Sequence, residues 1–227
     1  MTTGGKRMSK ENRGTLEVYE AMAIDWISCQ TRKHKEEPAK FAKKREAKRT
    51  RIFRFMEGMS PNPLVLEIGS GAGDDVSMLE SLGCRVQPSD GAQSFVNIME
   101  KKGLHPMLLD VSQKRIPGTW DAIIANHVFI HMTEEDFKRI LPKIYGALRP
   151  GGRFIFNVGN RDSEGGRSSG WMDLPGFHHI GAVRYFHYWK NYHLIQCVEE
   201  AGFIVKKYEV DGGEDNRRWI EICAIKP

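Results

Sequence analysis

The apolar residues of this chain follow two alternating patterns from residue 64 onward. Short apolar runs at 64–68, 84–89, 106–109, 120–125 and 153–158 predict buried strands. Between them, residues 72–82, residues 93–102 and a segment that opens at Thr133 repeat apolar side chains at helical spacing. Pro142 is expected to kink the last of these helices or to start a second one. Strands that alternate with helices predict a parallel sheet covered by helices.

The end of the chain departs from this alternation. A turn at 149–152 is expected before the fifth strand, 153–158. A glycine-rich, aromatic loop is expected after it at 159–189, and a helix follows at 192–201. Two strands, 203–210 and 219–225, are then joined by DGGEDNRR. This linker is too short for a crossover helix, so the two strands are expected to pair antiparallel.

The segment before the first strand carries most of the positive charge. Residues 1–14 are expected to be disordered, 15–57 to form a helical cap, and 58–227 to form a core that makes one structural domain with the cap. Residues 1–57 have a net charge of +7, against −2 for the rest of the chain. The basic segment 32–54 permits three interpretations: a solvated helix face with Phe41, Ile52 and Phe55 packed inward, a nucleic-acid footprint, or attraction for an anionic small substrate.

Composition restricts the compartment and the cofactors. The chain has no run of about 18 apolar residues and no apolar segment after its first residues, so we expect neither a membrane span nor a secretion signal. Four cysteines without a CxxC pair indicate reduced thiols and a cytoplasmic location. The eight histidines lack metal-ligand spacing, so no metal site is expected.

The stretch VLEIGSGAG carries the candidate chemistry. A buried strand ends at Ile68, and glycine then stands at Gly69, Gly71 and Gly73 ahead of a helix. Glycine lets the backbone turn sharply and approach a ligand closely, so this arrangement indicates a nucleotide-binding corner. A tight strand-to-helix turn without any ligand is the alternative.

Two aspartates narrow the choice of ligand. Asp74 stands where the dinucleotide fingerprint has its third glycine, and Asp75 follows it. Both carboxylates would repel a pyrophosphate at the helix N-terminus. The corner therefore suits a ligand without phosphates.

The motif ExGxGxG after an apolar strand resembles motif I of the class I S-adenosylmethionine-dependent methyltransferases, and the resemblance covers about residues 60–227. It implies an α/β fold: a three-layer Rossmann-like sandwich around a seven-stranded, mostly parallel sheet with a C-terminal antiparallel hairpin. It also implies S-adenosylmethionine as the methyl donor.

The resemblance assigns roles to individual residues. Asp90, at the end of the second strand, would hold the ribose hydroxyls, and Asp110 with the Val111 amide would meet the adenine. Asn126 and Glu67 would lie near the methionine part of the cofactor, and Tyr19 would close over its carboxylate. A turn aspartate, a helix cap and a packed tyrosine are the alternatives for Asp90, Asp110 and Tyr19. The full cofactor set is Tyr19, Glu67, Gly69, Ser70, Gly71, Gly73, Asp90, Gly91, Asp110, Val111 and Asn126.

Residues for catalysis and for the acceptor are less well defined by the sequence. His127 and His131 follow the fourth strand, where either could act as a general base or as part of the scaffold. Candidate acceptor contacts, with plain packing as the alternative for each, are Trp26, His178, His179, Tyr185 and Tyr188.

Three functions fit these observations. The first is methylation of an O or N atom of a small-molecule metabolite. The second is methylation of RNA, because the basic segment could bind phosphates and VYEAMAIDW has some likeness to tRNA wobble-uridine methyltransferases. The third is a cofactor-binding regulator without catalysis. No NPPY-like run is present, which argues against the amino-group methyltransferases that use it.

Overall fold

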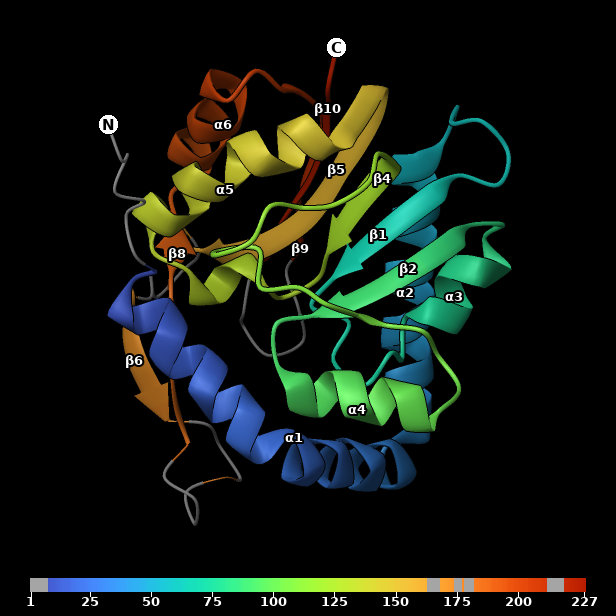
Figure 1. Cartoon of the computed structure of the whole chain (residues 1–227), viewed down its shortest axis with the longest axis vertical. Coiled ribbons are helices and arrows are strands. Elements are labelled where there is room, and N and C mark those ends of the chain that lie inside the picture. The colour runs from blue at the N-terminus through green and yellow to red at the C-terminus, as the bar shows by residue number, and fades with distance from the viewer. Residues whose placement is uncertain (1–7, 163–167, 174–176, 178–181, 212–218) are drawn as a thin grey trace.

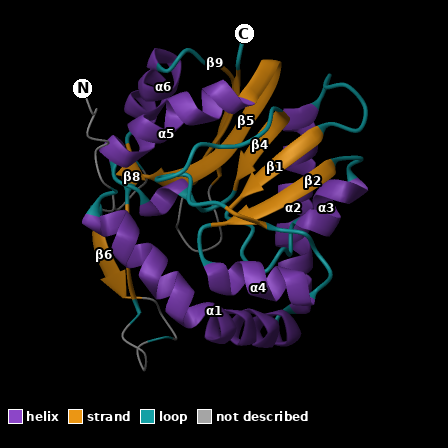
Figure 2. Cartoon of the chain, viewed as in Figure 1, coloured by secondary structure: helices purple, strands orange, loops and turns teal. Residues whose placement is uncertain are grey.

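The computed structural model describes residues 8–162, 168–173, 177, 182–211 and 219–227, and its elements form three layers (Figures 1 and 2). The central sheet has the strand order β3-β2-β1-β4-β5-β10-β9, with β8 paired to β5. The sheet strands are β1 Leu64–Ile68, β2 Arg85–Asp90, β3 Met107–Leu108, β4 Trp120–Ala125, β5 Leu148–Asn160, β8 Tyr188–Trp189, β9 Ile204–Asp211 and β10 Trp219–Ile225.

Only β10 runs against the other strands of this order. It pairs antiparallel with both β5 and β9, whereas β1 pairs parallel with β2 and β4, and β4 pairs parallel with β5. The predicted seven-stranded, mostly parallel sheet with a C-terminal antiparallel pair is thus confirmed, with β8 as an additional short strand. The predicted linker between β9 and β10 lies outside the described residues.

Helices cover both faces of the sheet. On one face α5 packs against β5 and α6 against β9, and on the other face Ile52 and Phe55 of α2 pack with Met78 and Leu79 of α3. The helices are α1 Lys10–Glu36, α2 Pro38–Met56, α3 Val76–Ser81, α4 Gln93–Lys101, the short 3-10 helix η1 Phe129–His131, α5 Glu134–Ala147 and α6 Asn191–Glu200. Within these ranges no helix combines the length and apolar composition needed to cross a bilayer.

The N-terminal helix starts earlier than the sequence predicts. Residues 10–14, expected to be disordered, belong to α1. Ser9 caps this helix because its hydroxyl accepts the Asn12 N–H at 3.1 Å and donates to Asp136 of α5. The first seven residues lie outside the described ranges.

Three further boundaries differ from the predicted ones. Helix α3 begins at Val76 rather than at residue 72, because the glycine loop continues in turn conformations up to that point. Helix α5 continues through Pro142 without a second start, since Ile140, Leu141 and Ile144 pack in one core on either side of it. The predicted turn at 149–152 is part of the long strand β5.

The predicted loop at 159–189 contains strands of its own. β6 (Gly170–Asp173) and β7 (Val183–Phe186) pair antiparallel in a small second sheet, and β8 joins the main sheet. β7 packs against α1. α1 and the second sheet therefore lie together beside the carboxyl ends of the main strands (Figure 1).

Candidate functional site

A cavity of about 270 Å³ lies at the carboxyl ends of β1, β2 and β4, with α1 forming one wall. This is the edge at which open α/β sheets bind ligands. Eleven of the residues predicted from the sequence line it: Tyr19, Trp26, Gly69, Gly71, Asp90, Gly91, Asp110, Val111, Asn126, His127 and His131.

The glycine loop after β1 brings bare backbone to this cavity. Gly69 and Gly71 have φ of +70° and +55°, in the left-handed region that favours glycine. A Cβ on Gly69 would lie 2.4 Å from Cγ2 of Val128, whereas a Cβ on Gly71 would meet no protein atom within 4 Å. Gly71 therefore leaves open space at the cavity wall that a ligand can approach.

Asp90, the last residue of β2, holds the loop in place. One carboxylate oxygen accepts the Gly71 N–H at 2.9 Å and the other accepts the Ala92 N–H at 2.9 Å. Burial raises the pKa of this carboxyl, and the backbone N–H donors counteract that rise. Each carboxylate oxygen can accept a second hydrogen bond, so Asp90 has the capacity to receive a diol as well.

Glu67 on β1 is a buried acid that lacks a full set of partners. Only 2% of its surface is exposed, and its Oε2 has no hydrogen-bond partner among the described residues. Burial, together with repulsion from Asp75, raises the pKa of Glu67 to about 7. Asp75 accepts hydrogen bonds from Lys48 at 2.8 Å and from the Asn126 side-chain amide at 3.2 Å. The unpartnered oxygen is therefore suited to a donor that arrives with a ligand.

The raised pKa of Glu67 makes a testable contribution to stability. The folded protein holds a proton on Glu67 that the unfolded chain loses near its ordinary pKa of 4.5, so this contribution is fully present below pH 4.5 and is lost as the pH rises through 7. The loss is on the order of 3 kcal/mol. We expect Glu67→Gln to remove this fall in the free energy of unfolding, measured by urea denaturation between pH 5 and 8.

Glu57 gives the control for this experiment because its side chain is 67% exposed. Glu57→Gln should leave the pH dependence of stability as it is in the parent. If the Glu67→Gln protein loses stability with pH as steeply as the parent, Glu67 does not carry the titration.

Asp110 and Val111 follow β3 at the far end of the cavity. Asp110 accepts the Ser112 N–H at 2.9 Å and the Ser112 hydroxyl at 2.6 Å, as a capping residue does. The Val111 carbonyl accepts a hydrogen bond from Lys143 at 2.9 Å. Both bonds to Ser112 use the same oxygen of Asp110. Asp110 can therefore cap the Ser112 turn and still present its other carboxylate oxygen to the cavity.

His131 belongs to a buried polar network. Its Nδ1 lies 2.7 Å from the Tyr185 carbonyl oxygen, which can only accept, so Nδ1 carries the proton and Nε2 accepts the Tyr19 hydroxyl at 2.9 Å. The oxygen of Tyr19 in turn accepts from Arg184. Burial, reinforced by the Arg184 charge, lowers the pKa of His131 to about 3. The imidazole is neutral and both nitrogens are occupied, which favours a scaffold role.

His127 takes a strained conformation beside the cavity. Its φ is +57°, and its N–H donates to the Asn157 side-chain oxygen at 2.6 Å. The imidazole lies against Trp219, with 4.4 Å between ring centroids. Backbone strain held by a buried hydrogen bond is common at functional sites, so His127 is the histidine of this cavity better suited to chemistry.

Some predicted residues lie away from the cavity wall. Ser70 secures the loop instead, since its hydroxyl accepts the Ser89 N–H at 3.1 Å, and Tyr188 stacks on Phe186. Tyr185 contributes its backbone to the His131 network. The predicted residues that are described but are not lining residues are Glu67, Ser70, Gly73, Tyr185 and Tyr188. His178 and His179 lie outside the described residues.

Several residues of the site carry no clear signal in the sequence. Asn12, Thr15 and Leu16 of α1 line the cavity, and the Asn12 side-chain nitrogen is buried without a partner in the described structure. Their helical spacing was the available signal, but they fell in or next to the segment expected to be disordered. Arg184 of β7 was missed because it lies within the predicted loop.

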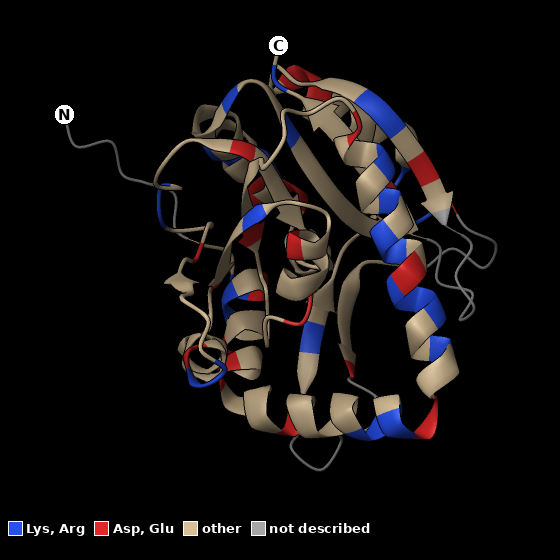
Figure 3. Cartoon of the chain, turned by 90° about the vertical axis from the view of Figure 1, so that its right-hand side faces the viewer, with Lys and Arg blue, Asp and Glu red and all other residues tan. Residues whose placement is uncertain are grey.

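The basic segment ends α1 and, from Pro38 onward, forms most of α2, along which Lys and Arg recur (Figure 3). Several of these cations pair with acids of the core domain. Lys48 lies 2.8 Å from Asp75, and Arg51 lies 3.2 Å from the buried Glu221. These pairs attach α2 to the sheet, as expected for a structural helix with a solvated face.

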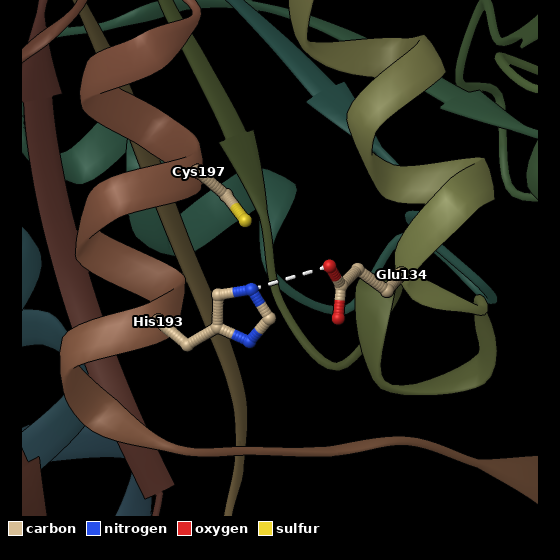
Figure 4. Close-up of side chains that lie close together, drawn as sticks. All are labelled: Glu134, His193 and Cys197. Atoms are coloured by element: carbon tan, nitrogen blue, oxygen red, sulfur yellow. Dashed lines mark ion pairs between the residues drawn. The ribbon is translucent and has the colours of Figure 1, made fainter.

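One cluster elsewhere has the composition of a metal site. Glu134, His193 and Cys197 place one ligand atom each within 4.8 Å of one another, at the start of α5 and along α6 (Figure 4). Lys138 already lies 2.7 Å from the Glu134 carboxylate, and burial raises the pKa of the Cys197 thiol. The Glu134 carboxylate is thus already paired with Lys138 and lies 3.3 Å from His193 Nε2, and we assign no metal there.

Solved structures share this fold. The 1,6-didemethyltoxoflavin-N1-methyltransferase of Burkholderia thailandensis, bound to 1,6-didemethyltoxoflavin and S-adenosylhomocysteine, has a TM-score of 0.66 at 17% identity, covering 98% of this chain and 92% of its own. The magnesium protoporphyrin IX methyltransferase of Synechocystis PCC 6803 with bound S-adenosylhomocysteine has a TM-score of 0.67 at 15% identity, covering 94% of this chain and 100% of its own. A search of curated protein sequences finds no significant match.

A family profile identifies the enzyme class. The profile described as a methyltransferase domain matches residues 33–207, which include the glycine loop, Asp90 and β4. The match agrees with the sheet order, with the cavity at its carboxyl edge, and with the family that VLEIGSGAG resembles. The chain belongs to the methyltransferase domain family and is an enzyme with the Rossmann-like fold of the class I S-adenosylmethionine-dependent methyltransferases.

Proposed function

We propose that this enzyme transfers a methyl group from S-adenosylmethionine to an O or N atom of a small-molecule metabolite. The observation that carries the proposal is the cavity of about 270 Å³ that the glycine loop, Asp90 and α1 line together. A cavity of this size, walled by the Tyr19 and Trp26 side chains, suits a metabolite better than a polymer.

The residues present fit the cofactor. Asp90 can accept the ribose hydroxyls, and Gly71 leaves room for close approach. The unpartnered Glu67 oxygen suits an ammonium group, and so does the Asn126 carbonyl oxygen, since the Asn126 amide nitrogen already donates to Asp75. When bound, the cofactor supplies a methyl group on a sulfonium sulfur, which leaves as a neutral thioether.

The protein's own contribution is alignment and desolvation. The residues that line the cavity would hold the acceptor O or N in line with the carbon–sulfur bond that breaks and would exclude water from it. The acceptor proton passes to water or to His127, which lines the cavity. His131 keeps Tyr19 in place, because its two ring nitrogens are already bonded.

One experiment distinguishes the proposed function from an RNA methyltransferase and from a cofactor-binding regulator. The enzyme is incubated with S-adenosylmethionine labelled in its methyl group and with a cell extract divided by ultrafiltration into small molecules and RNA. We expect enzyme-dependent label in the small-molecule fraction and none in the RNA. The Asp90→Asn protein serves as the inactive control.

Label in tRNA that disappears when the salt concentration is raised would instead support the RNA methyltransferase. Tight binding of S-adenosylhomocysteine without label in either fraction would support the regulator. Either result would overturn the proposal of a small-molecule acceptor.

A further inference from the structure

Arg184 is a buried cation beside the cavity. It lies on β7, 6% of its surface is exposed, and its guanidinium carbon lies 5.0 Å from the ring centre of Tyr19 and 5.4 Å from that of Trp26. Both of these rings line the cavity. A third ring, that of Phe186, lies 5.2 Å from the same carbon. Arg184 is therefore not itself a lining residue but lies behind the Tyr19 and Trp26 rings that wall the cavity.

The partners of Arg184 are incomplete. The guanidinium has five N–H donors, and within the described residues its one side-chain hydrogen bond goes to the Tyr19 hydroxyl. Its Nε is buried without a partner, and none of the described carboxylates lies within ion-pair distance of it. Three aromatic rings stabilise the cation in part, but a buried arginine normally has an anionic partner as well. The missing partner is an anion.

The cavity is lined by acids and backed by a cation. Asp90 and Asp110 line it and Glu67 lies behind the glycine loop, whereas Arg184 lies behind the Tyr19 and Trp26 rings. Like charges repel in a site of low dielectric, so an anion is disfavoured near the acids and favoured near the guanidinium. The acids therefore favour a cationic methyl donor, and the wall formed by Tyr19 and Trp26 in front of Arg184 favours an anionic group of the acceptor.

We propose that Arg184 binds an anionic group of the methyl acceptor, a carboxylate or a phosphate that is not itself methylated. This inference rests on the proposed small-molecule function and specifies the class of its substrate. The origin of Arg184 supports the acceptor over the cofactor, because β7 belongs to the segment between β5 and α6 and not to the strands that carry the glycine loop and Asp90. Planar guanidinium groups bind carboxylate and phosphate through two parallel hydrogen bonds.

The first test is the charge of the natural product. The labelled product from the small-molecule extract is passed over an anion-exchange resin at pH 8. We expect it to be retained and to elute with salt, since the bound anionic group survives the reaction. A labelled product that is neutral or cationic would overturn this inference and leave the small-molecule methyltransferase standing, whereas no labelled product would count against the proposed function itself.

The second test uses Arg184→Gln and Arg184→Lys. With the extract fraction that contains the acceptor, we expect Arg184→Gln to raise the apparent KM about 30-fold or more, because one partner of a buried charge pair is removed. Arg184→Lys keeps the charge and should recover part of that loss. The control is Arg149→Gln, which removes an exposed arginine paired with Asp121 and should leave KM within about two-fold.

Calorimetry tests whether Arg184 binds the acceptor or the carboxylate of the cofactor. S-adenosylhomocysteine carries a carboxylate, and 5′-methylthioadenosine lacks the whole amino-acid part. We expect Arg184→Gln to bind both within about two-fold of the parent. Weaker binding of S-adenosylhomocysteine alone would assign Arg184 to the cofactor carboxylate and overturn the inference. A lower Tm with unchanged KM would make Arg184 a purely structural clamp for Tyr19, and if Arg184→Gln fails to fold, the charge of the product still decides.

Discussion

Replacing Asp90 by asparagine is expected to weaken the binding of S-adenosylhomocysteine by about 100-fold, because two hydrogen bonds from the ribose to a charged acceptor are lost or reversed. The asparagine amide also places N–H donors against the Gly71 or Ala92 N–H, where the carboxylate accepts from both at 2.9 Å. The glycine loop would then lose its anchor at β2. Isothermal calorimetry of the purified variant measures the effect, with circular dichroism to confirm that the sheet is intact.

The matched control is Asp74→Asn. Asp74 lies in the same loop, but its side chain is 66% exposed and pairs with Lys102 at 3.1 Å. Removing that exposed pair should change the affinity by no more than about two-fold. Equal affinities for the Asp90→Asn and parent proteins would show that the ribose does not bind at Asp90.

The fold and the convergence of Gly69, Gly71 and Asp90 on one cavity could be predicted because their signals are local. Gly69 and Gly71 directly follow a buried strand, and Asp90 ends the next one, so parallel pairing brings them to one edge without any long-range information. The same pairing places Asn126, after β4, next to that edge. Short apolar runs between turn residues define these strands well.

The contacts of Arg184 and of the start of α1 could not be predicted because they are long-range. Arg184 contacts Tyr19 across 165 residues of sequence. Its neighbours on β7 pair with β6, and neither strand has an alternating apolar pattern strong enough to predict this small sheet. Asn12 was missed because helix α1 starts at a cap, Ser9, whose second partner, Asp136, lies 127 residues away. Tertiary contacts decide such boundaries.

The role of His131 shows why residue type and register are not enough. Its position after β4 suited both a general base and a scaffold residue. The distinction depends on its two ring partners, Tyr19 on α1 and the Tyr185 carbonyl on β7, which lie 112 and 54 residues away. With those partners present the neutral ring has no free nitrogen to accept a proton from a substrate.

Replacing Gly71 by alanine is expected to weaken S-adenosylhomocysteine binding by about ten-fold or more while lowering stability by only about 1 kcal/mol. The small stability cost follows because a Cβ at Gly71 meets no protein atom within 4 Å and must only accept a φ of +55°. The large affinity loss follows because that open space is where the cofactor approaches the backbone.

Gly83 makes this prediction decisive, because it has a φ of +83° and likewise has open space around its missing Cβ, but it lies outside the cavity lining. Gly83→Ala should therefore lose a similar free energy of unfolding in urea and keep the parent affinity. Gly69→Ala should lose more stability than either, since its Cβ would collide with Val128 at 2.4 Å. If Gly71→Ala and Gly83→Ala bind S-adenosylhomocysteine equally well, no ligand approaches the loop at Gly71, and the cofactor must lie elsewhere in the cavity.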